Sequence, residues 1–170
     1  MSALSLEEIN EQNPEKIYDL PLTLNIKKWQ TFSLPVNLTS YSKKIKFDEN
    51  IRQQMDSIKD KKGIYMFVVE PNFPFVPRID YLLYIGRVIK SDTFFKRFSD
   101  YVNSIGNKNV RRNIQLLTNA WIEKTFVYFF EINNDQNIID TEKQLINIIV
   151  PSLNNQLYLK GAHNPRSILN

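Results

Sequence analysis

Short apolar segments and helix-like patterns alternate along the chain after about residue 62. Three segments are rich in aromatic and β-branched side chains, which favours β-strands: residues 63–70, 81–88 and 124–132. Apolar side chains three and four positions apart predict amphipathic helices at residues 92–103 and 138–149. The Pro-rich segment 71–80 joins the first two strands without a helix, so these strands should pair antiparallel.

The remaining segments give weaker patterns. Residues 48–59 place Ile51, Met55 and Ile58 on one face of a predicted helix, and a short basic helix is expected around 108–118. Residues 5–12 fit a short helix, and residues 20–40 fit short extended pieces because prolines interrupt them. Together the elements predict an α+β fold, with a small antiparallel or mixed sheet of about three strands flanked by helices.

The same pattern divides the chain into three parts. Residues 62–155 hold the regular elements and form the expected core. Residues 1–61 are expected to be an N-terminal arm that could serve dimerisation or DNA recognition, and residues 156–170 a polar tail.

Composition excludes several kinds of site. The chain has no cysteine and a single histidine, His163, so disulfides, thiolate metal sites and histidine-rich zinc sites are excluded. No apolar run approaches the roughly 18 residues of a membrane span, and the N-terminal residues are acidic, unlike a signal peptide. We therefore expect a soluble cytoplasmic protein with no membrane partner.

The net charge of +4 is unevenly distributed. Residues 1–60 carry 8 Lys/Arg and 9 Asp/Glu, whereas residues 61–170 carry 14 Lys/Arg and 9 Asp/Glu, a net charge of +5. A basic main body favours a polyanionic partner, although many ordinary proteins carry a similar charge.

Glu142 interrupts the apolar face of the last predicted helix. It lies four residues after Ile138 and three before Leu145, on the same stripe. A lone carboxylate there is costly to remove from water, so it needs a cation or good donors. From the helix alone, a salt bridge to a neighbouring Arg or a position at the water-facing edge of the stripe is the simpler interpretation. The alternative is a ligand for a hard divalent cation.

Arg97 raises a similar question on residues 92–103. It lies three residues after Phe94 and four before Tyr101, beside the apolar face of that helix. Its stem can be covered there while the guanidinium reaches a partner. It could be an ordinary surface-seeking Arg, could pair with Glu142, or could bind a phosphate through its planar fork of donors.

Two tyrosines lie on the first two predicted strands. Alternation places Tyr65 with Phe67 on one face, and Tyr84 with Leu82 and Gly86 on one face. Tyrosines in strands most often serve packing. Gly86 has no side chain and would permit a ligand or a neighbour to approach the backbone closely.

Taken together, these residues resemble the GIY-YIG nuclease superfamily. Gly63-Ile64-Tyr65 and Tyr84-Ile85-Gly86 resemble its two defining tripeptides. The order continues with Arg97 four residues before Tyr101, and then with Glu142 twelve residues before Asn154 of Pro151-Ser152-Leu153-Asn154. The resemblance covers residues 62–155. It departs from the family in a longer connection between the tripeptides and in Arg87, where many relatives carry Lys.

The resemblance implies a metal-dependent DNA endonuclease. Glu142 would bind one Mg²⁺ (or Mn²⁺), Tyr65 would be the general base in a site that favours its phenolate, and Arg97 would offset charge on the phosphate. Tyr84 and Tyr101 would orient water or phosphate, and Asn154 would position the site through its amide. Packing or capping the loop after the helix is an equally simple role for Tyr101 and Asn154.

Further basic residues are candidates for DNA contacts: Arg87, Lys108, Arg111, Arg112, Lys124, His163 and Arg166. A solvated charged face explains several of them equally well. The compact chain favours a restriction endonuclease, acting as a homodimer where both strands are cut. A homing, repair or toxin-like nuclease, a non-cleaving nucleic-acid-binding module and a partner-binding domain are alternatives.

Overall fold

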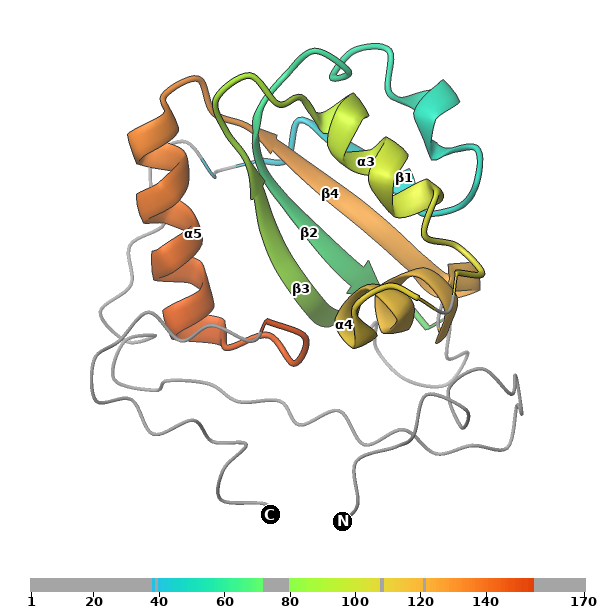
Figure 1. Cartoon of the computed structure of the whole chain (residues 1–170). Helices are drawn as coiled ribbons and strands as arrows, with labels where there is room; N and C mark the ends of the chain where they lie inside the picture. The colour runs from blue at the N-terminus through green and yellow to red at the C-terminus, as the bar shows by residue number, and fades with distance from the viewer. Residues whose placement is uncertain (1–37, 39, 72–79, 108, 121, 155–170) are drawn as a thin grey trace.

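A computed structural model of the chain describes residues 38, 40–71, 80–107, 109–120 and 122–154 (Figure 1). The strands among these residues are β1 (Lys43–Lys46), β2 (Gly63–Val69), β3 (Tyr81–Val88) and β4 (Thr125–Glu131). The helices are α3 (Phe94–Val102), α4 (Arg112–Gln115) and α5 (Asp135–Ile149), with two short 3₁₀ helices, η2 (Ile51–Gln54) and η4 (Ile122–Lys124), and one π-helical turn, η3 (Leu116–Ala120).

The sheet has the order β1-β4-β2-β3, and each neighbouring pair is antiparallel. The α+β class and the antiparallel pairing of β2 with β3 are therefore confirmed. The expectation of about three strands is corrected, because the described residues hold four. The short strand β1 was missed because its sequence, Lys-Lys-Ile-Lys, buries only Ile45 and gives too short an alternation to recognise.

Each face of the sheet packs against its own apolar cluster. One cluster, the α3-side core, includes Phe67 and Phe129 of the sheet with Phe94 and Phe98 of α3. The other, the α5-side core, joins Ile64 and Ile85 of the sheet to Ile138, Leu145 and Ile146 of α5. Figure 1 shows α3 crossing in front of β4 and β1, while α5 lies beside β3. Helix α5 thus packs on β3 and β2, whereas α3 covers the opposite face of the sheet.

The segment 48–59 does not form the α-helix that its apolar spacing predicts. The helix predicted at 48–59 is only the 3₁₀ helix η2 followed by turns, with backbone hydrogen bonds such as Met55 N–H to Arg52 C=O and Ile58 N–H to Met55 C=O. Ile51, Met55 and Ile58 are all buried as the spacing predicts, but the turns after η2, and not a continuous α-helix, bring Met55 and Ile58 to the core.

Described residues on both sides of the expected boundary at residue 61 share one apolar core. Ile45, Phe47, Met55 and Ile58 pack in the α3-side core together with residues of β2 and α3. Residues 1–37 and 156–170, the rest of the expected arm and tail, lie outside the described residues. In the described part, none of the helices combines the length and the apolar character needed to cross a membrane.

A β-bulge changes the faces of β3. Phe67 pairs with Tyr84 and Val68 pairs with Leu82, so Leu83 is the extra residue. Leu83 belongs to the α3-side core and Tyr84 packs against it, whereas Leu82 packs against the α5-side core. The expectation that Leu82 shares a face with Tyr84 was wrong, because strict alternation cannot anticipate a bulge.

Candidate active site

The two tripeptides meet directly in the sheet. Tyr65 of β2 is the cross-strand partner of Gly86 of β3, and a Cβ at Gly86 would overlap the end of the Tyr65 ring. Gly63 begins β2 with a φ of +146°, and a Cβ there would overlap the carbonyl oxygen of Phe130. Both glycines are therefore required by close approach, one by the tyrosine ring and one by the neighbouring backbone.

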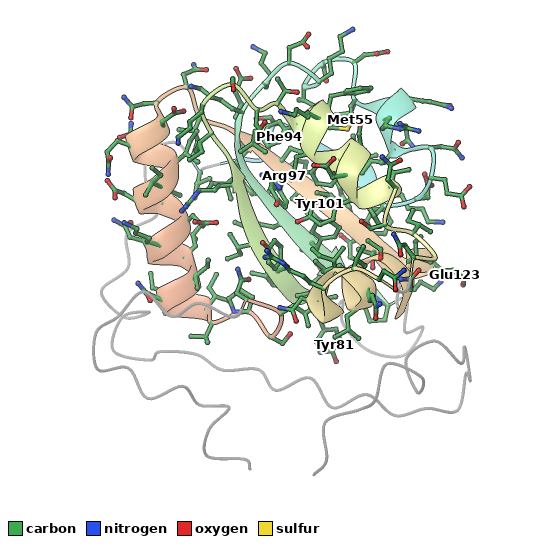
Figure 2. All side chains as sticks on the ribbon, viewed as in Figure 1. Met55, Tyr81, Phe94, Arg97, Tyr101 and Glu123 are labelled. Carbon is green, nitrogen blue, oxygen red and sulfur yellow. The ribbon has the colours of Figure 1, made fainter. Side chains whose placement is uncertain are left out.

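A cavity of about 1010 Å³ opens at this edge of the sheet. The six residues predicted as catalytic all line it: Tyr65, Tyr84, Arg97, Tyr101, Glu142 and Asn154. They come from β2, β3, α3, α5 and the segment after α5. In Figure 2 the labelled Arg97 and Tyr101 extend from α3 toward the sheet. The fold thus brings together residues that are up to 89 positions apart between Tyr65 and Asn154.

The tyrosines form a buried cluster on the floor of the cavity. The hydroxyls of Tyr65 and Tyr101 are 2.9 Å apart and share a hydrogen bond. Tyr65 is 2% exposed and Tyr101 is 5% exposed, while Tyr84 is half-buried with its ring centroid 6.2 Å from that of Tyr65. Phe98 packs edge-on against the Tyr65 ring and fixes its orientation.

Burial works against ionisation of these hydroxyls. Burial raises the pKa of Tyr65 well above its ordinary value, and the neighbouring Tyr101 and Tyr84 add to the rise, while the positive charge of Arg97 only partly opposes it. Burial also raises the pKa of Tyr101 and Tyr84, and the charge of Glu142 further raises the pKa of Tyr84. In the chain alone the loss of hydration outweighs the charge of Arg97, so a phenolate at Tyr65 needs further positive charge, such as that of a bound metal ion.

Glu142 faces the cavity from α5 and is only 6% exposed. Its Oε2 accepts a hydrogen bond from Nη1 of Arg87, and the two groups form an ion pair. Arg87 and Ile85 are two residues apart on β3, so Arg87 points to the face that α5 covers. The salt bridge expected as the simpler explanation of Glu142 therefore exists, and it lies in the cavity wall.

Arg97 is held by a different carboxylate. Its Nη2 lies 3.6 Å from Oδ2 of Asp92, while its Nε is buried without a hydrogen-bond partner among the described residues. Asp92 also binds Lys96, and this hydrogen bond, with a smaller contribution from Arg97, holds the pKa of the Asp92 carboxyl below its usual value. The ion pair found for Arg97 is with Asp92, and the ion pair found for Glu142 is with Arg87. The Arg97 side chain is 38% exposed and lines the cavity, so its guanidinium can reach an anion there.

Asn154 binds the backbone of β3. Its Oδ1 accepts from the Ile85 N–H at 2.9 Å and its Nδ2 donates to the Ile85 carbonyl at 2.7 Å. Leu153 N–H donates to the Leu83 carbonyl at 2.9 Å, and Asn113 of α4 donates to the Leu153 carbonyl at 2.6 Å. The Asn154 amide therefore satisfies the free edge of β3 as a neighbouring strand would, instead of capping the loop after α5.

The carboxylates of the cavity fit a hydrated Mg²⁺ or Mn²⁺. Glu142 and Asp100 both line it, and the described residues hold no group of three acidic or histidine side chains placed to bind a metal. Mg²⁺ uses one or two carboxylates and keeps several waters, and the cavity is large enough for such a hydrated ion. A site built wholly from protein ligands, such as those that hold Zn²⁺, has no counterpart in this cavity.

The candidate DNA-contact residues divide into three groups. Arg87 and Arg111 line the cavity. Lys124, at the end of η4, is exposed but does not line it. Lys108, His163 and Arg166 lie outside the described residues, as does the side chain of Arg112.

Several residues that line the cavity are not among those predicted from the sequence: Asp100, Ser104, Asn109 and Asn113. For the first two a signal existed, because Asp100 and Ser104 lie three and seven positions after Arg97 and so share its helical face. Asn113 and Asn109 gave no such signal, since their place in the cavity depends on how the segment between α3 and β4 folds back.

Comparison of the chain with protein-family models, with curated proteins and with solved structures finds no match. The resemblance to the GIY-YIG nucleases therefore remains a prediction that rests on the motif residues and on their arrangement around this cavity.

Proposed function

We propose that the chain is a metal-dependent endonuclease that hydrolyses phosphodiester bonds of DNA, with its active site in the Tyr65–Glu142 cavity. The supporting observation is the convergence of six motif residues from five parts of the fold on one cavity. Ordinary packing would account for buried tyrosines. It gives no reason for a nearly buried Glu142 and a partly unpaired Arg97 to face the same space.

Each residue has a role that follows from its position. Arg97 would bind a non-bridging oxygen of the phosphate, because it lines the cavity and its side chain is 38% exposed. Tyr84 would orient the attacking water beside Tyr65, and Asn154 would hold β3 in place through Ile85. A divalent ion at Glu142 would supply positive charge that stabilises both the phosphate transition state and a phenolate at Tyr65.

Tyr65 would accept the proton of the attacking water. Its raised pKa keeps it protonated in the chain alone, so the base would form only when more positive charge has entered the cavity. Tyr101 can stabilise the resulting phenolate, since its hydroxyl is already 2.9 Å from that of Tyr65 and can donate to it. Activity should then require both the metal and the two hydroxyls.

Incision of supercoiled plasmid with Mg²⁺ or Mn²⁺ tests the proposal. Glu142→Ala and Tyr65→Phe should each lower the rate by about two to four orders of magnitude, and a chelator should abolish it. Glu131→Gln and Tyr128→Phe are matched controls, because Glu131 pairs with Lys61 outside the cavity and Tyr128 does not line it. Equal incision by all five proteins would refute the proposal and identify a contaminating nuclease.

A non-cleaving nucleic-acid-binding module is the second candidate. Two observations favour it. The raised pKa of Tyr65 keeps the proposed base protonated, and the ion pair with Arg87 occupies the proposed metal ligand Glu142. Tight DNA binding by the wild-type chain, with no incision under Mg²⁺ or Mn²⁺, would establish it. A domain that binds only a protein partner would instead show no salt-dependent DNA binding.

Within the nuclease proposal, a restriction endonuclease is the leading role. One cavity makes one incision, so cutting both strands would require two copies of the chain, as in a homodimer. Sequencing the ends cut from a random-sequence library separates the roles. A short fixed site supports restriction, a long site supports homing, a branched-structure preference supports repair, and indiscriminate nicking supports a toxin-like nuclease.

A further inference from the structure

The ion pair between Arg87 and Glu142 lies at the position where a cation would have to bind. Both side chains line the cavity, and the Arg87 guanidinium reaches the carboxylate from the edge strand β3. The Glu142 side chain is 8% exposed, whereas that of Arg87 is 30% exposed. The carboxylate is therefore fixed in the wall, and the guanidinium is the partner with access to water.

A nearly buried carboxylate needs a positive partner, and Arg87 supplies one in the chain alone. Arg97, which lines the cavity from α3, is paired with Asp92 instead. A divalent cation and a guanidinium compete for the same carboxylate oxygens. The cation must therefore displace the arginine or share the carboxylate with it. Displacement would leave Arg87 free in the cavity, where a phosphate is the natural new partner.

We propose that Arg87 is a positioning residue that holds Glu142 until a divalent cation replaces it, and that Arg87 then binds the phosphate backbone of the substrate. This inference rests on the proposed function, because it takes Glu142 as the metal ligand. It makes metal and DNA binding mutually reinforcing, since the metal frees the arginine and the phosphate then keeps it away from Glu142.

The exchange predicts two effects of opposite sign for Arg87→Gln. Without the arginine, the metal-free carboxylate loses this ion pair. The metal-bound state gains in comparison, so the affinity for Mn²⁺ should rise by about tenfold, the scale of one 1.4 kcal/mol interaction. Binding of duplex DNA should weaken, because a phosphate contact is lost. An arginine that only contacts phosphate would leave Mn²⁺ affinity unchanged.

The test is Mn²⁺ titration of the full-length protein without DNA, with free Mn²⁺ followed by electron paramagnetic resonance. Four proteins are compared: wild type, Arg87→Gln, Glu142→Gln and the matched control Lys62→Gln, which breaks the Lys62–Asp135 pair away from the cavity. Duplex binding is measured in parallel by fluorescence anisotropy with Mn²⁺ present, each variant being placed in a Tyr65→Phe background that prevents cutting. We expect tighter Mn²⁺ binding and weaker DNA binding only in Arg87→Gln, and loss of Mn²⁺ binding in Glu142→Gln.

The outcomes separate the two proposals. Mn²⁺ binding that is unchanged in Glu142→Gln would remove the metal role of Glu142, and with it the exchange. Mn²⁺ binding that depends on Glu142 but is unchanged or weaker in Arg87→Gln would overturn the exchange and leave the proposed function standing. If Arg87→Gln fails to fold by circular dichroism, Arg87→Lys decides: an ammonium lacks the planar fork, so Mn²⁺ affinity should rise about two- to fivefold, and no rise would overturn the exchange.

Discussion

Tyr65 and Gly86 are direct cross-strand partners, and the ring of the tyrosine occupies the space that a side chain at Gly86 would need. The two tripeptides of the sequence are therefore one structural unit, in which the glycine of the second makes room for the tyrosine of the first. Tyr65 cannot easily move aside, because Phe98, Tyr84 and Tyr101 surround its ring.

Gly86→Ala should displace the Tyr65 ring. The added methyl would overlap the ring in a packed cluster, so stability should fall by about 1–3 kcal/mol, as for other overpacked cores. Displacement of the hydroxyl by about 1 Å should lower plasmid incision about 100-fold. Urea unfolding gives the stability change, and incision by the folded fraction gives the rate.

A double-mutant comparison isolates this contact. In a Tyr65→Leu background the smaller side chain leaves room for the methyl, so Gly86→Ala should cost less than in the wild type. Strictly additive costs would show that the ring and the glycine are independent.

Periodicity was sufficient for the main elements because burial on one face dictates it. The strands β2, β3 and β4 and the helices α3 and α5 all lie within the predicted segments or extend them by a few residues. The motif spacing likewise selected six residues that line one cavity. These features depend on local pattern, which the sequence carries directly.

The missing features depend on contacts between distant segments. The extra residue Leu83 follows from the register of β3 against β2, and the pairing of Glu142 with Arg87 follows from where α5 packs on that strand. The raised pKa of Tyr65 arises from burial beneath α3, which no property of residues 63–70 could indicate. The residues of the site could therefore be predicted from the sequence, whereas their ion pairs and protonation depend on tertiary packing.

Alkaline pH should destabilise the chain through its buried tyrosines. Burial raises the pKa of Tyr65 above the ordinary value of 10.0, so the unfolded chain loses that proton at a lower pH than the folded chain. The resulting stabilisation is fully present below about pH 10 and is lost as pH rises toward the folded-state pKa. Its slope approaches about 1.4 kcal/mol per pH unit for each such tyrosine.

The free energy of unfolding of Tyr65→Phe should therefore fall less steeply with pH between about pH 9 and pH 11.5. The difference in slope should reach at most about 1.4 kcal/mol per pH unit, which corresponds to one proton. Urea unfolding at each pH measures the difference. Phe67→Leu is the control, because it weakens the same core without removing a hydroxyl, and its curve should run parallel to the wild type. A Tyr65→Phe curve that also runs parallel would mean that the Tyr65 hydroxyl ionises equally easily in both states.

Asn154 should act through β3 and not on the substrate. Asn154→Ala removes both hydrogen bonds to Ile85, leaving the edge of the strand without them, so stability should fall by about 1–3 kcal/mol. Amide hydrogen exchange at Ile85 should become faster than in Asn137→Ala, a control on the exposed face of α5. Unchanged exchange at Ile85, together with lost incision, would instead place the Asn154 amide on the substrate.

The path of DNA over the surface can be tested with two exposed basic residues that differ in position. Arg111 lines the cavity, whereas Lys124 does not. Each phosphate contact contributes about 0.9 to the slope of log K against log salt, so Arg111→Gln should lower that slope by about one unit. Lys124→Gln should leave it unchanged. Duplex binding by anisotropy across salt concentrations, in a chelator to prevent cutting, measures both slopes. If only Lys124→Gln lowered the slope, the DNA would bind away from the cavity. Tyr65 and Glu142 would then lie out of reach of the phosphate.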